Sequence, residues 1–89
     1  MAMTIYTPKA SPAVGAVLRR VRQEAGVSVA HMASATGHTE KQVRNWETGV
    51  SPVKRAIVLA WAVICHVDPD ELVHEVAVTE RTWTTHKAA

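Results

Sequence analysis

The chain has 89 residues, 47% of them hydrophobic and 20% charged, which is the size and composition of one small globular domain. Its net charge of +2 is too small to indicate a nucleic-acid partner by itself, so the placement of the basic residues has to decide. One cysteine, Cys65, excludes an intramolecular disulfide and a cysteine-based zinc cluster, and its apolar surroundings predict a buried, inert thiol.

The N-terminal arm, residues 1–10, is predicted to be extended, because Thr4 to Thr7 have strand propensity and Pro8 interrupts them. It lacks the basic region and the apolar stretch of a signal peptide. The longest apolar run of the chain, Ala56 to Cys65, is about half as long as a membrane span. We therefore expect a cytoplasmic, intracellular protein that makes no contact with membranes.

Residues 11–73 contain five helix starts, each a capping side chain that precedes a run of helical spacing. A proline in the first helical position strengthens three of these starts, and glycines that favour a left-handed conformation end three of the runs. The caps are Ser11, Ser28, Thr39, Ser51 and Asp68, and the terminating glycines are Gly26, Gly37 and Gly49. We therefore expect five helices with short connections, the fifth of them short.

The C-terminal segment, residues 74–89, has a different pattern. The run H-E-V-A-V-T-E-R-T-W-T-T is rich in valine and threonine, and its period is closer to two, which predicts a β-strand. This strand could pair with an N-terminal strand at Thr4 to Thr7, or with its own copy across a two-fold axis. We therefore interpret residues 74–89 as a candidate dimerisation element.

The run from Ala56 to Cys65 is apolar on every side, so the helix that contains it is expected to be buried on every side. One face fills the core of the domain, and either the C-terminal segment or a second copy of the chain has to cover the other. Trp61 and Trp83 are either anchors of such an interface or ordinary core residues. Together with Val76 and Val78 of the predicted strand, they make up the predicted dimer interface.

A three-residue turn, Thr36-Gly37-His38, joins the second and third helices, and such a connection is typical of a helix-turn-helix. In the third helix, only Val43 and Trp46 are expected to face inward. The major groove of DNA admits one helix and presents distinguishable donors, acceptors and methyl groups. The pattern therefore predicts that the polar side of residues 39–48 enters the major groove.

Residues along most of the chain match the sequence pattern of a known protein family. They are Leu18, Arg22, Gly26-Val27-Ser28, Met32-Ala33, Gly37, Thr39, Val43, Trp46-Glu47-Thr48-Gly49, Ala60 and Leu72. From Val14 to Leu72 the sequence resembles the Cro/repressor-type, XRE-like helix-turn-helix family of phage repressors and bacterial regulators. The resemblance implies a mainly α, compact five-helix, lambda-repressor-like domain, here with a C-terminal β-strand extension. It departs from the family at Ser28-Val29, where many members have Ser-Gln and the glutamine contacts a phosphate.

The resemblance also implies which side chains read the bases. In this family the first, second and sixth positions of the third helix usually reach base edges, and Glu40, Lys41 and Asn45 occupy them here. Lysine donates to guanine, asparagine pairs with adenine, and glutamate accepts from cytosine. Glu40 could instead complement the helix dipole. Arg44 is a further candidate for a base contact, with a phosphate contact as its alternative.

Several other polar residues are candidates for contacts to the DNA backbone. The resemblance favours the loop into the fourth helix, because its amides and first-turn cations face the backbone in relatives. Each basic residue among the candidates could equally be a solvated surface charge, and Arg19 and Arg20 are interpreted as plain surface. The candidates are Ser28, Thr39, Gln42, Lys54, Arg55 and Lys9.

Glu47 is predicted to have a structural role. In the family the matching glutamate pairs with an arginine of the first helix, and Arg22 occupies that position here. Such a pair would clamp the third helix to the first, and removing one partner would leave a partly buried charge without its mate.

We predict a sequence-specific transcriptional regulator of double-stranded DNA, a Cro-like repressor that occupies an operator and needs no cofactor. A homodimer would place two recognition helices about 34 Å apart and would require a near-palindromic operator. Three alternatives stay open: an antitoxin that represses its own operon, a recombination directionality factor, and a protein-interaction module without a DNA role. Val29 and the modest net charge favour the last of these.

Catalysis and metal binding are not expected. The five histidines show no metal-ligand spacing with acidic residues or with the cysteine. The sequence also has no glycine-rich phosphate loop and no plausible pair of nucleophile and base.

Overall fold

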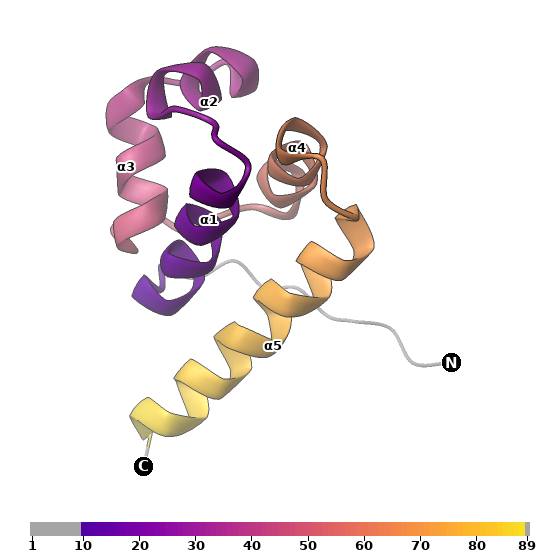
Figure 1. The fold of residues 1–89 in the computed structure, drawn as a ribbon. Coiled ribbons are helices and arrows are strands. Elements are labelled where there is room, and N and C mark those ends of the chain that lie inside the picture. Colours follow the sequence, from indigo (N-terminus) through magenta and orange to yellow (C-terminus); the bar gives the residue numbers. More distant parts are fainter. Residues whose placement is uncertain (1–9, 89) are drawn as a thin grey trace.

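The computed structural model describes the backbone of residues 10–88 and the side chains of residues 10–82. This part of the chain forms five α-helices, in which α1 lies at the centre, with α2 and α3 on one side and α4 and α5 on the other (Figure 1). The helices are α1 (Pro12–Glu24), α2 (Val29–Thr36), α3 (Glu40–Thr48), α4 (Arg55–Cys65) and α5 (Pro69–Ala88). The predicted helical domain is therefore present, and the helix-turn-helix consists of α2 and α3.

Four of the five helices begin at the predicted side-chain cap. In each of them a side-chain oxygen accepts a hydrogen bond from a backbone N–H of the first helical turn. The capping residues are Ser11, Ser28, Thr39 and Asp68. At the other end, Gly37 closes α2 and Gly49 closes α3 in the left-handed conformation, with φ of 74° and 81°.

The predicted start of the fourth helix at Ser51-Pro52 is wrong. The helix begins at Arg55, and its N-cap residue, Lys54, makes no side-chain capping hydrogen bond. The segment before it buries Val53 in the core, where this side chain is 2% exposed. Because the core takes up Val53 from a non-helical segment, the helix starts later than the local sequence indicates.

The predicted C-terminal β-strand is also wrong, because residues 69–88 form one long helix, α5. No residue between 10 and 88 belongs to a strand, and the predicted N-terminal strand at Thr4 to Thr7 lies outside the described residues. The buried residues of α5 recur three and four positions apart, which is the spacing of one helix face. They are Leu72, Val73, Val76, Ala77 and Glu80. This face packs on α1 and α4, so tertiary contacts outweigh the strand propensity of the valines and threonines.

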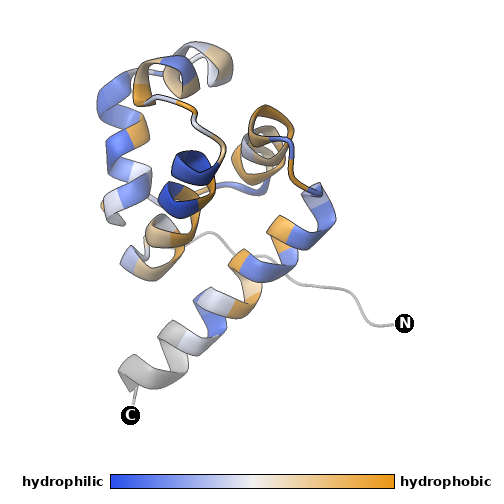
Figure 2. Cartoon of the chain, in the orientation of Figure 1, coloured by the Kyte–Doolittle hydropathy of each residue, from blue (hydrophilic) through white to orange (hydrophobic). Residues whose placement is uncertain are grey.

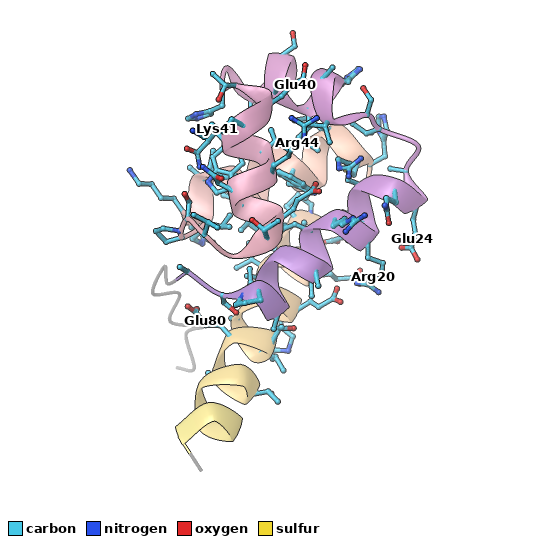
Figure 3. All side chains as sticks on the ribbon, turned by 90° about the vertical axis from the view of Figure 1, so that its left-hand side faces the viewer. Arg20, Glu24, Glu40, Lys41, Arg44 and Glu80 are labelled. Atoms are coloured by element: carbon cyan, nitrogen blue, oxygen red, sulfur yellow. The ribbon has the colours of Figure 1, made fainter. Side chains whose placement is uncertain are left out.

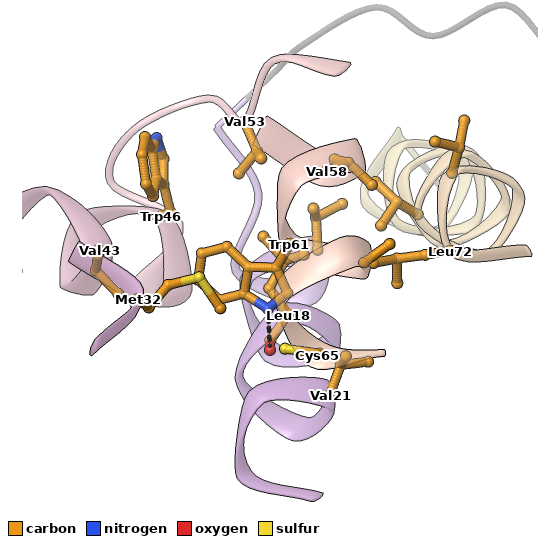
Figure 4. Close-up of a cluster of buried hydrophobic side chains, with 14 of the residues drawn as sticks. Leu18, Val21, Met32, Val43, Trp46, Val53, Val58, Trp61, Cys65 and Leu72 are labelled. Carbon is orange, nitrogen blue, oxygen red and sulfur yellow. Dashed lines mark hydrogen bonds between the residues drawn. The ribbon is translucent and has the colours of Figure 1, made fainter. Parts of the chain in front are cut away.

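The hydrophobic core is centred on Trp61, which has no exposed surface (Figure 4). Its indole Nε1 donates a hydrogen bond to the Leu18 carbonyl over 2.9 Å, and the ring of Trp46 meets it edge to face. Val76 is fully buried as well. Both Trp61 and Val76 were predicted at a dimer interface, and the structure places them inside the domain instead.

The outer face of α4 is not covered in the structure, although Figure 2 shows this helix as mostly hydrophobic. Val63 is 66% exposed, and Ala56 on the same face is exposed too. The C-terminal segment therefore does not cover this face, and burial of α4 on every side would need a second copy of the chain, which stays a prediction. Within the part of the chain that the structure describes, no helix is both long enough and apolar enough to cross a membrane.

Candidate nucleic-acid interface

Helix α3 buries a narrow stripe and leaves its other side to solvent. The stripe consists of Val43, Trp46 and Glu47, so the two residues predicted to face inward do so. Lys41 is exposed and Asn45 is half-buried. Since positions four apart share a face of a helix, these two side chains lie together on the side opposite to the stripe. The helix therefore presents a polar ridge that the domain itself leaves open.

Close backbone contact with α1 fixes the position of α3. Gly15 of α1 lies so near the backbone of α3 that a methyl group on its Cα would overlap the carbonyl of Glu47. At the end of α3, Gly49 lies equally close to the backbone of Pro12. Neither position has room for a side chain, because the obstacle in both cases is backbone that cannot rotate away.

An ion pair between Arg22 of α1 and Glu47 of α3 reinforces this contact. The two side chains meet through two hydrogen bonds, Nε to Oε2 over 2.6 Å and Nη2 to Oε1 over 3.0 Å, and both are almost completely buried. The hydrogen bonds that Arg22 donates to the Glu47 carboxylate raise the pKa of Arg22, which stays protonated. Arg22 also donates to the carbonyl of Val27, so it ties the start of the helix-turn-helix to α1. The predicted structural pair is thus present.

The four residues predicted to read bases lie along α3 and differ in their surroundings. Glu40, Lys41 and Arg44 are exposed, and Figure 3 shows Lys41 at the outer edge of α3 and Arg44 on the side towards α1. Glu40 accepts a long hydrogen bond of 3.4 Å from Arg44, and both side chains are more than half exposed. Such an exposed pair one helical turn apart is weak, so both groups are free to find other partners. Asn45, in contrast, is partly shielded by its neighbours.

A hollow opens on each flank of α3. The first, of about 260 Å³, lies where α1, α2 and α3 meet. The second, of about 300 Å³, lies between α3 and the segment that leads into α4. The first is lined by Arg19, Arg22, Val29, Arg44, Glu47 and Thr48, and the second includes His38, Gln42, Trp46 and Lys54. The polar ridge of α3 is therefore bordered on both sides by depressions that contain basic side chains.

The structure groups some of the predicted backbone-contacting residues and separates others. Gln42 and Lys54 line the same hollow, although they belong to different segments. The hydroxyls of Ser28 and Thr39 cap α2 and α3, and both residues are exposed. Arg55 is exposed at the first position of α4. The remaining candidate, Lys9, lies outside the described residues.

Two arginines of α1 have contacts that the sequence did not indicate. Arg20 pairs with Glu75 of α5 over 2.5 Å. This contact could not be predicted, because the sequence indicated a strand, rather than a helix, at residues 74–89. Arg19 lines the hollow between α1 and α3 together with Arg44. The signal for Arg19 lies in its spacing, since it is four residues after Gly15 and three before Arg22 on one face of α1.

The remaining predictions concern Val78 and Trp83 at the dimer interface, metal binding, and Cys65. Val78 is 39% exposed, and the side chain of Trp83 lies outside the described part of the chain. Among the described residues no group of three histidine, cysteine, aspartate or glutamate side chains could hold a metal ion. Cys65 is buried, and burial raises the pKa of its thiol, which agrees with the predicted inert role.

Comparison with known proteins bears on this arrangement. The helix-turn-helix domain family matches residues 13–74 of the chain. The fold is similar to that in the crystal structure of the clp gene regulator ClgR from C. glutamicum, with a TM-score of 0.65 and 21% sequence identity over 83% of this chain and 97% of that chain. No curated protein matches the sequence. Because the family match spans most of the chain, the protein belongs to the helix-turn-helix domain family, as the resemblance to XRE-like DNA-binding proteins predicted.

Proposed function

We propose that the protein is a sequence-specific transcriptional regulator that inserts α3 into the major groove of double-stranded DNA. The observation that carries this proposal is the polar ridge of α3, which lies opposite the side that packs on α1 and on which Lys41 is exposed and Asn45 half-buried. A helix of about 10–12 Å diameter fits a major groove about 12 Å wide. The ridge is therefore available to base edges without any rearrangement of the domain.

Glu40, Lys41 and Asn45 are the proposed base-reading residues. Lys41 is exposed on the ridge and can donate to guanine, and Asn45 beside it can pair with adenine. Glu40 stands at the start of α3, where its carboxylate also complements the helix dipole. Each good contact of this kind discriminates against a wrong base by about 1–3 kcal/mol.

Gln42, Lys54 and Arg55 are the proposed contacts to the backbone on the side of α4. Gln42 and Lys54 line one hollow, and Arg55 occupies the first turn of α4. No side chain caps the start of α4, so its first backbone N–H groups are free to donate to a phosphate. Ser28 and Thr39 complete this proposed set through their exposed hydroxyls.

We further propose that the regulator acts as a Cro-like repressor, which binds as a homodimer and blocks a near-palindromic operator. Val63 of α4 and Val78 of α5, two of the exposed large apolar side chains of the described chain, are the proposed contacts to a second copy. A two-fold dimer would place its two α3 helices about one turn of DNA, or 34 Å, apart.

Selection of bound sequences from a random pool of double-stranded DNA tests the proposal. The natural chain should enrich one motif, and Lys41→Ala should change the preferred base at one position of it. Lys54→Ala is the matched control, because it should weaken binding to all sequences alike and reduce the salt slope by about 1. A pool without any enriched motif would contradict sequence-specific binding.

A further inference from the structure

We propose that the hollow between α1, α2 and α3 binds one phosphate of the DNA backbone between Arg19 and Arg44. The inference rests on the proposed function and assigns Arg44 to the backbone rather than to a base. It also gives a role to Arg19, which the sequence marks only as surface. The argument depends on the charge of the hollow, on the two helices that form it, and on its place beside α3.

The hollow carries positive charge that the protein does not neutralise. Of the charged groups that line it, Arg22 and Glu47 are bonded to each other and cancel. Arg19 is exposed and forms no ion pair with any described residue. Arg44 has only its long, exposed contact with Glu40. Because the exposed Arg44–Glu40 pair is weak and Arg19 has no charged partner among the described residues, the hollow can take up an anion. The planar guanidinium groups of the two arginines suit phosphate oxygens.

The two arginines come from helices that are locked together at this point. Gly15, Arg19 and Arg22 share one face of α1. Gly15 lies against the backbone of Glu47 of α3, and Arg22 forms an ion pair with its side chain. Arg19 therefore emerges at the junction of α1 and α3, where it lines the hollow with Arg44. Because α1 and α3 pack closely at Gly15 and the Arg22–Glu47 ion pair joins them, the backbone positions of Arg19 and Arg44 are held relative to each other before any ligand binds.

The place of the hollow indicates which anion it meets. A helix that fills the major groove has one row of phosphates on each of its two flanks, since the two strands border the groove. The flank towards α4 has Gln42 and Lys54. The flank towards α1 has Arg19 and Arg44, with Val29 as an apolar wall. With α3 in the groove, the arginine hollow faces the strand that the α4 side does not reach.

The test uses the full chain with Arg19→Gln, Arg44→Gln and the double substitution. Arg81→Gln is the matched control, because it removes the same charge from an exposed position on α5. Binding to the selected operator and to unrelated duplex DNA is measured over a series of salt concentrations. Thermal unfolding of each variant confirms that the domain is intact.

Each single substitution is expected to weaken binding to both DNAs by roughly tenfold, because it removes a charge-assisted hydrogen bond. The double variant should reduce the salt slope by about 1, as expected for one shared phosphate. The base preference of Arg44→Gln should equal that of the natural chain, and Arg81→Gln should change nothing. A double variant with an unchanged salt slope, or a changed base preference for Arg44→Gln, would overturn the inference.

Inorganic phosphate separates a DNA site from a site for a free anion. Phosphate at the same ionic strength as chloride should compete only weakly with DNA, because a single phosphate lacks the neighbouring contacts. Tight binding of inorganic phosphate that is lost in the double variant, with DNA binding unchanged, would assign the hollow to a free anion and overturn the inference. If the natural chain binds no DNA at all, the proposed function itself is contradicted. Loss of the arginine effects with DNA binding retained would contradict only the phosphate site.

Discussion

Helices α3 and α4 follow each other in the chain and are held in place by different means. Helix α3 is largely hydrophilic, and only Val43, Trp46 and Glu47 of its nine residues are buried. Helix α4 is largely hydrophobic; it buries a similar share, four of its eleven residues, but all four are apolar and include the fully buried Trp61. Helix α3 has a side-chain cap at its start and a left-handed glycine after its end. Helix α4 has no side-chain cap, and the non-glycine residue His66 closes it.

The difference shows how a small domain can keep one helix free for a partner. The surface that a helix such as α4 buries in the core is no longer available to a binding partner. Helix α3 buries Val43 and Trp46 as well, but it is also held by the caps at its two ends, by backbone contact with Gly15, and by the ion pair of Glu47. These contacts occupy its ends and one side only, so the side with Lys41 and Asn45 stays open.

Removing the central side chain of α4 is expected to have the largest effect. Trp61→Ala should lower the free energy of unfolding by about 3–5 kcal/mol, because a fully buried ring leaves a cavity. Urea unfolding followed by far-UV circular dichroism measures the loss. Trp61→Phe keeps an aromatic ring but loses the hydrogen bond to Leu18, and should cost about 1–2 kcal/mol. Equal losses for the two variants would mean that burial of the ring is not what holds α4.

The corresponding test for α3 is Glu47→Ala, which leaves the buried guanidinium of Arg22 without its partner. We expect a loss of about 3 kcal/mol in the same unfolding experiment, at the lower end of the range for buried pairs. Glu40→Ala is the control, because it breaks an exposed pair on the same helix and should cost about 0.5 kcal/mol or less. The account of how α3 is positioned would be wrong if both substitutions had the same effect.

The sequence predicted α1, α2 and α3 well because their signals are local. A capping side chain and a terminating glycine act within one turn, so Ser28, Gly37, Thr39 and Gly49 define these helices without the rest of the fold. The start of α4 and the whole of α5 depend on distant contacts. Val53 delays α4 because the core takes it up, and α5 is a helix because one of its faces packs on α1 and α4.

The candidate site was predictable to the same extent. Periodicity alone places Lys41 and Asn45 on the open side of α3. The partnership of Arg22 with Glu47 came from the family resemblance. The spacing of Arg19 from Gly15 and Arg22 places it on the face of α1 that meets α3. Its proposed role also depends on the angle at which α1 crosses α3, and spacing within one helix does not contain that angle. For the same reason Trp61 was assigned to a dimer interface, because an apolar helix does not indicate which of its faces meets the core.

A smaller effect is expected at the start of α3. Thr39→Ala removes the side-chain oxygen that accepts from the N–H of Gln42, and should lower the free energy of unfolding by about 1 kcal/mol. Thr39→Ser keeps the capping oxygen and should stay close to the natural chain. Thermal unfolding of the three proteins measures both values. A serine variant as unstable as the alanine variant would show that the methyl group of Thr39, rather than the cap, is what matters.

The smallest effect is expected at the end of α4, and it should be a gain. His66 closes this helix with φ of 58°, a left-handed conformation that costs a residue with a side chain about 1–2 kcal/mol. His66→Gly removes this strain. The greater conformational freedom of glycine in the unfolded chain lowers the free energy of unfolding by about 0.5–1 kcal/mol and offsets part of the gain. The net gain should be about 0.5 kcal/mol, and thermal unfolding should show a small rise in Tm.

At the matching position after α3, Gly49→Ala should destabilise strongly, because Gly49 is left-handed and lies against the backbone of Pro12. The contrast drawn between the two helix ends fails if His66→Gly lowers Tm, since glycine would then be no better suited to this position than histidine.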